Sequence, residues 1–84
     1  MSQPEIIEWI KQNKLWFVVG YRLTHQEFDA EIWTHTNRNG RIISVGWWGA
    51  GATMEEALRV AYEKAKDLKY NGQEIKRIYR ENFK

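Results

Sequence analysis

The chain has 84 residues and a formal net charge of +2; 43% of the residues are apolar, five are tryptophan and none is cysteine. This length supports a single domain over residues 1–84, and the lack of cysteine excludes disulfides and thiolate metal sites. The N-terminus lacks the regions of a signal peptide and no apolar run approaches the roughly 18–20 residues that cross a bilayer, so we expect a cytoplasmic protein without membrane contact.

The first expected element is a short amphipathic helix that ends near Asn13. Ser2 and Glu5 form a capping-box pattern, and Pro4 lies in the first turn, where its missing N–H group is not needed. Apolar residues then recur at helical spacing, at Ile6, Ile7, Trp9 and Ile10.

Three stretches with a period of two follow and predict antiparallel strands over residues 15–23, 28–36 and 41–48. The polar residues 24–27 predict the first hairpin loop. The Asn39-Gly40 pair predicts a tight second turn, because both residues tolerate positive φ angles. The alternate residues expected on the core face are Leu15, Phe17, Val19, Tyr21 and Leu23, then Phe28, Ala30, Ile32 and Thr34, then Ile43, Val45 and Trp47.

A second helix is expected to begin after Thr53, which repeats the capping box with Glu56, and to continue to about Tyr70. Gly72 is the expected left-handed residue that ends it. Residues 73–84 predict a short terminal helix, with a strand through 74–80 as the alternative. The fold class is therefore α+β: a three-stranded antiparallel meander with helices packed on one face, in the order α-β-β-β-α plus a short C-terminal helix.

The sheet face away from the helices is the main candidate site. Aromatic and basic residues of the strands alternate with the core residues, so this face should present Trp16, Arg22, Trp33, His35 and Trp48. A contiguous exposed apolar patch usually marks a binding surface, and Trp and Arg dominate protein–protein interfaces. These five residues are therefore the predicted contacts of a protein partner. Alternatively, the tryptophans pair across strands or are covered by the C-terminal segment.

The sequence contains few residues that suit catalysis or cofactor binding. His25 and His35 are the two histidines, and no nucleophile–base pair or metal-ligand spacing accompanies them. The glycine-rich residues 46–53 open a helix, as phosphate loops do, but Glu55 and Glu56 follow where a lysine would be needed. We therefore expect no enzyme activity, no cofactor and no metal, and we interpret the glycines as a bulge and a strand-to-helix turn.

The order of elements over residues 4–70 resembles the double-stranded RNA-binding domain. The resemblance rests on four stretches of the chain, residues 4–7, 28–32, 39–41 and 49–57. In that family the first turn of the second helix carries phosphate-binding lysines, and here Met54, Glu55 and Glu56 occupy those places. The residues implied for nucleic-acid contact, together with the basic side chains of the turn and the tail, are Gln12, His25, Arg38, Arg41, Lys76, Arg77 and Arg80.

The stretch from Gly51 to Leu58 also resembles the strand-to-helix junction of HicB-type antitoxins, small intracellular inhibitors of a protein partner. The first functional hypothesis is therefore a non-catalytic inhibitor or adaptor, of the kind found in mobile elements, that docks on a protein through the sheet face. A homodimer is a further form of the same hypothesis. The second hypothesis is a nucleic-acid-binding domain.

Overall fold

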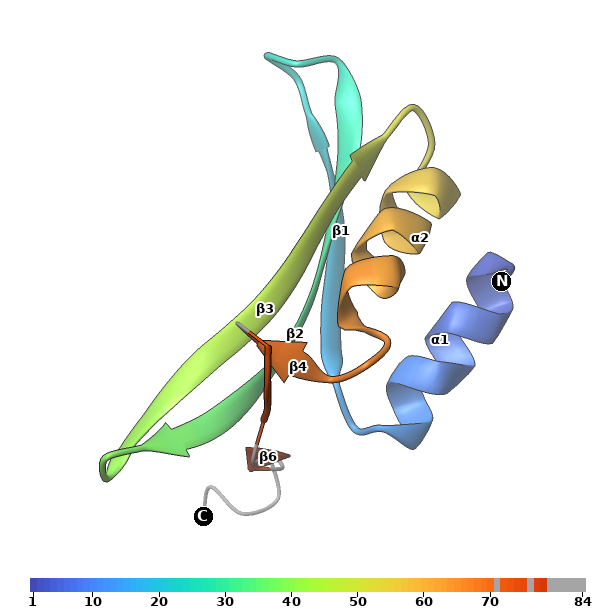
Figure 1. Cartoon of the computed structure of the whole chain (residues 1–84). Helices are drawn as coiled ribbons and strands as arrows, with labels where there is room; N and C mark the ends of the chain where they lie inside the picture. Colours follow the sequence, from blue (N-terminus) through green and yellow to red (C-terminus); the bar gives the residue numbers. More distant parts are fainter. Residues whose placement is uncertain (71, 76, 79–84) are drawn as a thin grey trace.

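The computed structural model describes residues 1–70, 72–75 and 77–78. Two helices and a three-stranded sheet make up most of the molecule (Figure 1). The elements, in chain order, are α1 (Gln3–Gln12), β1 (Trp16–Arg22), β2 (Glu27–Arg38), β3 (Arg41–Gly51), α2 (Met54–Ala65), β4 (Lys69–Tyr70), β5 (Gln73–Glu74) and β6 (Arg77–Ile78). The order α-β-β-β-α and the α+β class predicted from the sequence are confirmed.

The sheet is an antiparallel meander with β2 in the centre. The register pairs Phe17 with Ile32 and Ile32 with Trp47, so these three side chains lie on the same face. Asn39 and Gly40 form the two-residue turn between β2 and β3, with φ angles of 53° and 81°. Positive φ at both positions matches the twist of the strands, which is why this pair favours a tight hairpin.

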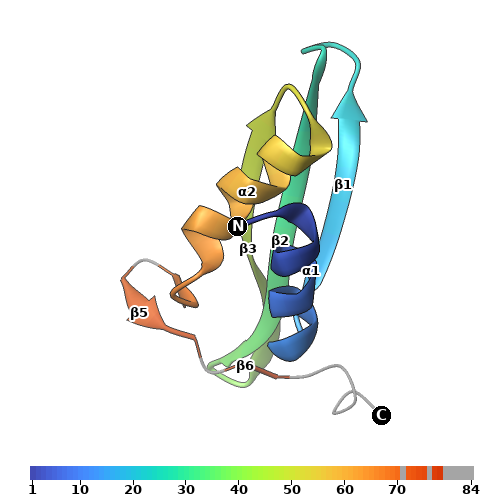
Figure 2. The same cartoon turned by 90° about the vertical axis from the view of Figure 1, so that its right-hand side faces the viewer.

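Both helices lie on one side of the sheet (Figures 1 and 2). Helix α2 lies across β3 and β2, and α1 packs beside α2, where the rings of Trp9 and Tyr62 meet edge to face with centroids 5.0 Å apart. The expected core face is confirmed at its centre, where Ala30, Ile32 and Trp47 are buried. The same face of β1 is covered less than the pattern predicts, because α2 lies over the other two strands, so Phe17 and Tyr21 remain 41% and 52% exposed.

The glycines of β3 allow α2 to approach the sheet closely. A Cβ atom at Gly49 would lie 2.5 Å from the carbonyl oxygen of Ala57 and 2.4 Å from the backbone nitrogen of Ala61. The register runs through Gly49 and Gly51 without interruption, so the expected bulge is wrong. These glycines serve packing: the missing side chains let the helix backbone contact the strand directly.

The end of α2 and the segment after it differ from the sequence prediction. Helix α2 ends at Ala65, because Leu68 adopts a φ of 53° and its N–H donates to the carbonyl of Ala65 at 2.7 Å. Gly72 has the predicted positive φ, 78°, but it lies in the turn between β4 and β5 and not at a helix end. The short C-terminal helix is also wrong over its described part, where β5 and β6 form and β6 pairs with the end of β2. The rest of that prediction, residue 76 and residues 79–84, lies outside the described residues.

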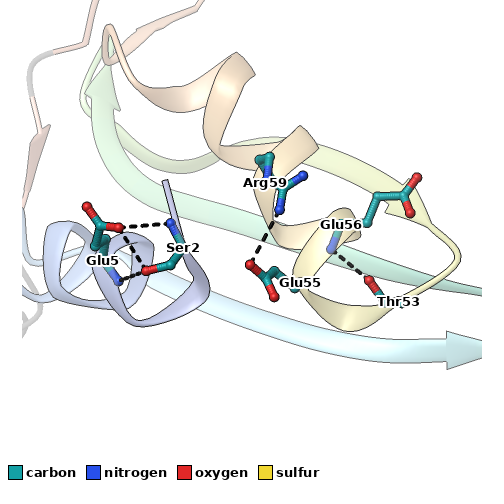
Figure 3. A network of polar contacts seen from close by, with 6 residues as sticks. All are labelled: Ser2, Glu5, Thr53, Glu55, Glu56 and Arg59. Carbon is teal, nitrogen blue, oxygen red and sulfur yellow. Dashed lines mark hydrogen bonds and ion pairs between the residues drawn. The ribbon is translucent and has the colours of Figure 1, made fainter.

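Side-chain caps fix the start of each helix (Figure 3). The hydroxyl oxygen of Ser2 accepts the N–H of Glu5, and the Glu5 carboxylate accepts the Ser2 N–H at 3.1 Å, which completes the predicted capping box. At α2, the Thr53 hydroxyl accepts the N–H of Glu56 at 3.1 Å. Each bond satisfies an N–H group of the first turn that has no partner inside the helix.

The cap of α1 predicts an acid-dependent loss of stability. Hydrogen bonds from the backbone and then the hydroxyl of Ser2 lower the pKa of Glu5 below its ordinary value of 4.5. A carboxyl group whose pKa is lowered by folding stabilises the folded state above the unfolded pKa, and this contribution is lost as the pH falls through the folded value. Urea unfolding at a series of pH values should therefore show that the stability of the wild type declines faster below about pH 4.5 than that of Glu5→Gln. Parallel curves for the two proteins would contradict this role of Glu5.

Among the described residues, the structure has no helix that is both long enough and apolar enough to cross a membrane.

Candidate functional site

The face of the sheet opposite the helices is formed by the strand residues that alternate with the core residues, and we call it the outer face. Its members, by register, are Trp16, Val18, Gly20 and Arg22 of β1, Glu27, Asp29, Glu31, Trp33, His35 and Asn37 of β2, and Ile42, Ser44, Gly46, Trp48 and Ala50 of β3. Val18, Ile42 and Trp48 are 60%, 54% and 44% exposed. All five residues predicted to contact a partner thus lie on one surface.

Three of these residues form an aromatic cluster: Trp16, Trp33 and His35. Trp16 is the register partner of Trp33, and their rings stack with centroids 4.7 Å apart and an interplanar angle of 21°. The His35 ring meets Trp33 edge to face at 5.2 Å, and its Nδ1 lies 3.4 Å from the Ser44 hydroxyl. Both tryptophans are half-buried by this arrangement. Cross-strand pairing, which the sequence left as an alternative, therefore accounts for part of their burial.

Trp48 lies apart from the aromatic cluster, and two cationic side chains lie near its ring. The guanidinium carbon of Arg22 lies 5.9 Å from the centre of the Trp48 ring, and the Lys64 ammonium lies 5.7 Å from it. Lys64 reaches it from α2 and donates to the Trp48 carbonyl at 2.7 Å. Arg22 also lies 3.7 Å from the Asp29 carboxylate. The ring keeps a large exposed area between these partners, which is the usual position of an interface anchor.

The strand residues of the outer face carry a net negative charge. The carboxylates of Glu27, Asp29 and Glu31 outnumber the guanidinium of Arg22, even with the Lys64 ammonium that reaches the Trp48 ring from α2. Sequence reasoning missed this property because it selected the aromatic residues and left their acidic neighbours aside. The signal was present in the alternation of β2, which places Glu31 on the same side as Trp33. A face of this charge repels phosphate groups and attracts basic side chains.

Among the described residues proposed for nucleic-acid contact, Arg38, Arg41 and Arg77 lie at one end of β2, and His25 lies at the other. Arg38 and Arg41 face each other at the turn between β2 and β3, on the side of the sheet opposite Trp33. His25 lies in the loop before β2, at the other end of that strand, where its Nδ1 lies 2.9 Å from the Thr24 hydroxyl. Twelve residues of extended chain place the two turns about 36 Å apart.

The other four positions of this set are distributed as follows. Gln12 is exposed at the last residue of α1, and Arg77 belongs to β6, where its register partner is Thr36. Lys76 and Arg80 lie outside the described residues.

Neither the histidines nor the acidic side chains of the described chain form a metal site. In the part of the chain that the structure describes, no three His, Asp or Glu side chains lie close enough to hold an ion. At the start of α2, Glu55 lies 3.4 Å from Arg59 (Figure 3), and the Glu56 Cγ atom would lie 2.6 Å from a Cβ atom placed at Gly51. The space beside Gly51 is thus filled by the Glu56 side chain.

Comparison of the chain with protein-family models, with curated proteins and with solved structures gave no match.

Proposed function

We propose that this chain is a small non-catalytic module that binds a protein partner through the outer face. The observation behind the proposal is the exposed ring of Trp48, which shares one face with the stacked pair Trp16 and Trp33, while both helices lie on the other side (Figures 1 and 2). Exposed aromatic rings beside an arginine are the usual anchors of protein interfaces. An inhibitor or adaptor needs such a face and no reactive group.

The positions of the histidines support a non-catalytic role. His25 lies in the loop that precedes β2, and His35 lies near the far end of that strand. The stretch of β2 between the two histidines is about 26 Å long, because an extended chain rises about 3.3 Å per residue. The two side chains therefore do not act on one substrate. His35 is held within the aromatic cluster by its contacts with Trp33 and Ser44.

Capture experiments on two matched variants test the proposal. Trp48→Ala is expected to lose a partner that the immobilised wild type retains from a cell extract, because the exposed ring would be the centre of the contact. Met54→Ala is the control: Met54 is similarly exposed, at 49%, but lies at the start of α2 on the other side of the sheet. Binding would be quantified by surface plasmon resonance. Equal loss with both variants, or retention by Trp48→Ala, would contradict docking through the outer face.

The element order also supports a second candidate, a nucleic-acid-binding domain, because α-β-β-β-α is the order of the double-stranded RNA-binding fold. Its contacts would come from the pair Arg38 and Arg41. The same biosensor distinguishes the two candidates. Retention of RNA or DNA falls steeply as salt rises, since counterions are released from phosphates, whereas docking on Trp48 changes little. The carboxylates of the outer face favour the first candidate.

A further inference from the structure

Glu31 lies in the middle of the outer face, between its aromatic residues. Its register partners are Val18 on β1 and Trp48 on β3, and Trp33 follows two residues later on the same side of β2. The carboxylate is exposed, and no residue of the described chain makes a hydrogen bond or ion pair with it. By contrast, the neighbouring Asp29 has the guanidinium of Arg22 at 3.7 Å.

The Trp33 ring stacks on Trp16 and meets the His35 ring edge to face. Its neighbours in the register are Trp16 on β1 and Gly46 on β3. Gly46 has no side chain: a Cβ atom placed there would lie 3.3 Å from Trp33 Cβ and 3.6 Å from Glu31 Oε1. The Trp33 side chain and the Glu31 carboxylate therefore both border the position above Gly46, where the strand carries no side chain.

A partner that covers Trp33 and Trp48 must also cover Glu31, which lies between them. Removing an ionised carboxylate from water is unfavourable unless a cation or several hydrogen-bond donors replace the water. We propose that the partner supplies an arginine side chain, which lies over Gly46 beside Trp33 and pairs with Glu31. This inference rests on the proposed function and specifies the chemistry of the partner.

The choice of arginine follows from the shape of the site. A guanidinium is planar, so it stacks on an indole face and at the same time donates two parallel hydrogen bonds to a carboxylate. An ammonium is a compact point charge that does not present a flat face. The excess of carboxylates over cations on the outer face attracts the same group at longer range. Residues that flank this arginine would be apolar, because they would rest on Val18 and Trp48.

Peptide titrations followed by NMR test the inference. The probes are the acetylated and amidated tripeptide Val-Arg-Val and the same peptide with citrulline, which keeps the planar shape without the charge. We expect the arginine peptide to shift the indole N–H signal of Trp33 and to bind about fivefold more tightly than the citrulline peptide. Glu31→Gln should reduce the affinity for the arginine peptide to that for citrulline.

Glu27→Gln is the matched control, because it removes the same charge from the same face at a position four residues away. This variant should keep the preference for arginine. Equal binding of the two peptides by the wild type, binding of neither, or equal loss in both variants would overturn the inference. The proposed function has a separate outcome: a partner whose capture depends on Trp48 and is unchanged by Glu31→Gln would support docking through the outer face and refute the arginine contact.

Discussion

Gly49→Ala is expected to lower the free energy of unfolding by about 3 kcal/mol or more, the upper range for forcing an extra group into a packed interior. The new methyl group would lie within 2.5 Å of backbone atoms of α2, at the Ala57 carbonyl and the Ala61 nitrogen. A backbone cannot rotate away as a side chain can, so the whole helix must shift. Because a domain of this size has a total stability of only about 4–13 kcal/mol, thermal unfolding should move down by more than about 12 °C.

Gly20→Ala is the control for this change. It places the same methyl group in a strand of the same sheet, but on the outer face, where the nearest atom is a carboxylate oxygen of Asp29 at 3.4 Å. We expect a change within about 0.5 kcal/mol, measured by the same thermal and urea unfolding. Similar losses for Gly49→Ala and Gly20→Ala would show that strand conformation, and not the approach of α2, determines the cost.

Trp47→Ala is expected to cost about 3–5 kcal/mol, the range measured for removing a large buried ring. Trp47 is 7% exposed, and its Nε1–H donates to the Lys69 carbonyl at 3.1 Å, so the ring both fills the core and holds β4 in place. The variant should be partly unfolded at 25 °C, and circular dichroism with urea titration would measure the loss.

The adjacent Trp48→Ala should cost only about 0.5–1 kcal/mol, because the exposed ring loses two distant cation contacts and little packing. The two variants remove the same atoms from neighbouring residues. The difference between their free energies of unfolding therefore measures the effect of lying on one face of the sheet or the other. Equal costs would mean that Trp48 is as deeply packed as Trp47, and the outer face would not be open.

Local patterns predicted most of the architecture. The alternation of apolar residues in β2 was sufficient to assign Ile32 to the core and Trp33 to the opposite face, because side chains of a strand alternate strictly. The Asn39-Gly40 turn and the Ser2 cap were also recognisable, since both depend on chemistry within four residues.

Contacts between distant residues explain what the patterns missed. Residues 66–70 include good helix formers, but the turn at Leu68 brings the Lys69 carbonyl to the Trp47 indole, 22 positions earlier in the chain. Helix propensity is worth only tenths of a kcal/mol per residue, so one buried ring with its hydrogen bond outweighs it. The exposure of Phe17 likewise depends on where α2 crosses the sheet, which periodicity does not specify.

The sequence predicted which aromatic and basic residues lie on the candidate site, but the negative charge of the site was not predicted. The five proposed contacts were assigned to one face, and they do share it, although whether they bind a partner stays a prediction. The importance of Glu31 and Gly46 appears only when three strands are placed side by side, because neither residue is near Trp48 and Trp33 at once in the linear sequence.

The close approach of α2 to β3 restricts substitution at position 49 more than at position 31. A Cβ atom at position 49 would collide with the backbone of Ala57 and Ala61, so this position must stay glycine as long as α2 keeps its approach to β3. The exposed Glu31 side chain makes no such backbone contact, so position 31 can vary together with a binding partner. Among homologous chains, a constant glycine at position 49 would indicate that the packing of α2 on β3 is shared. Substitutions at position 31 would instead indicate a change of binding partner.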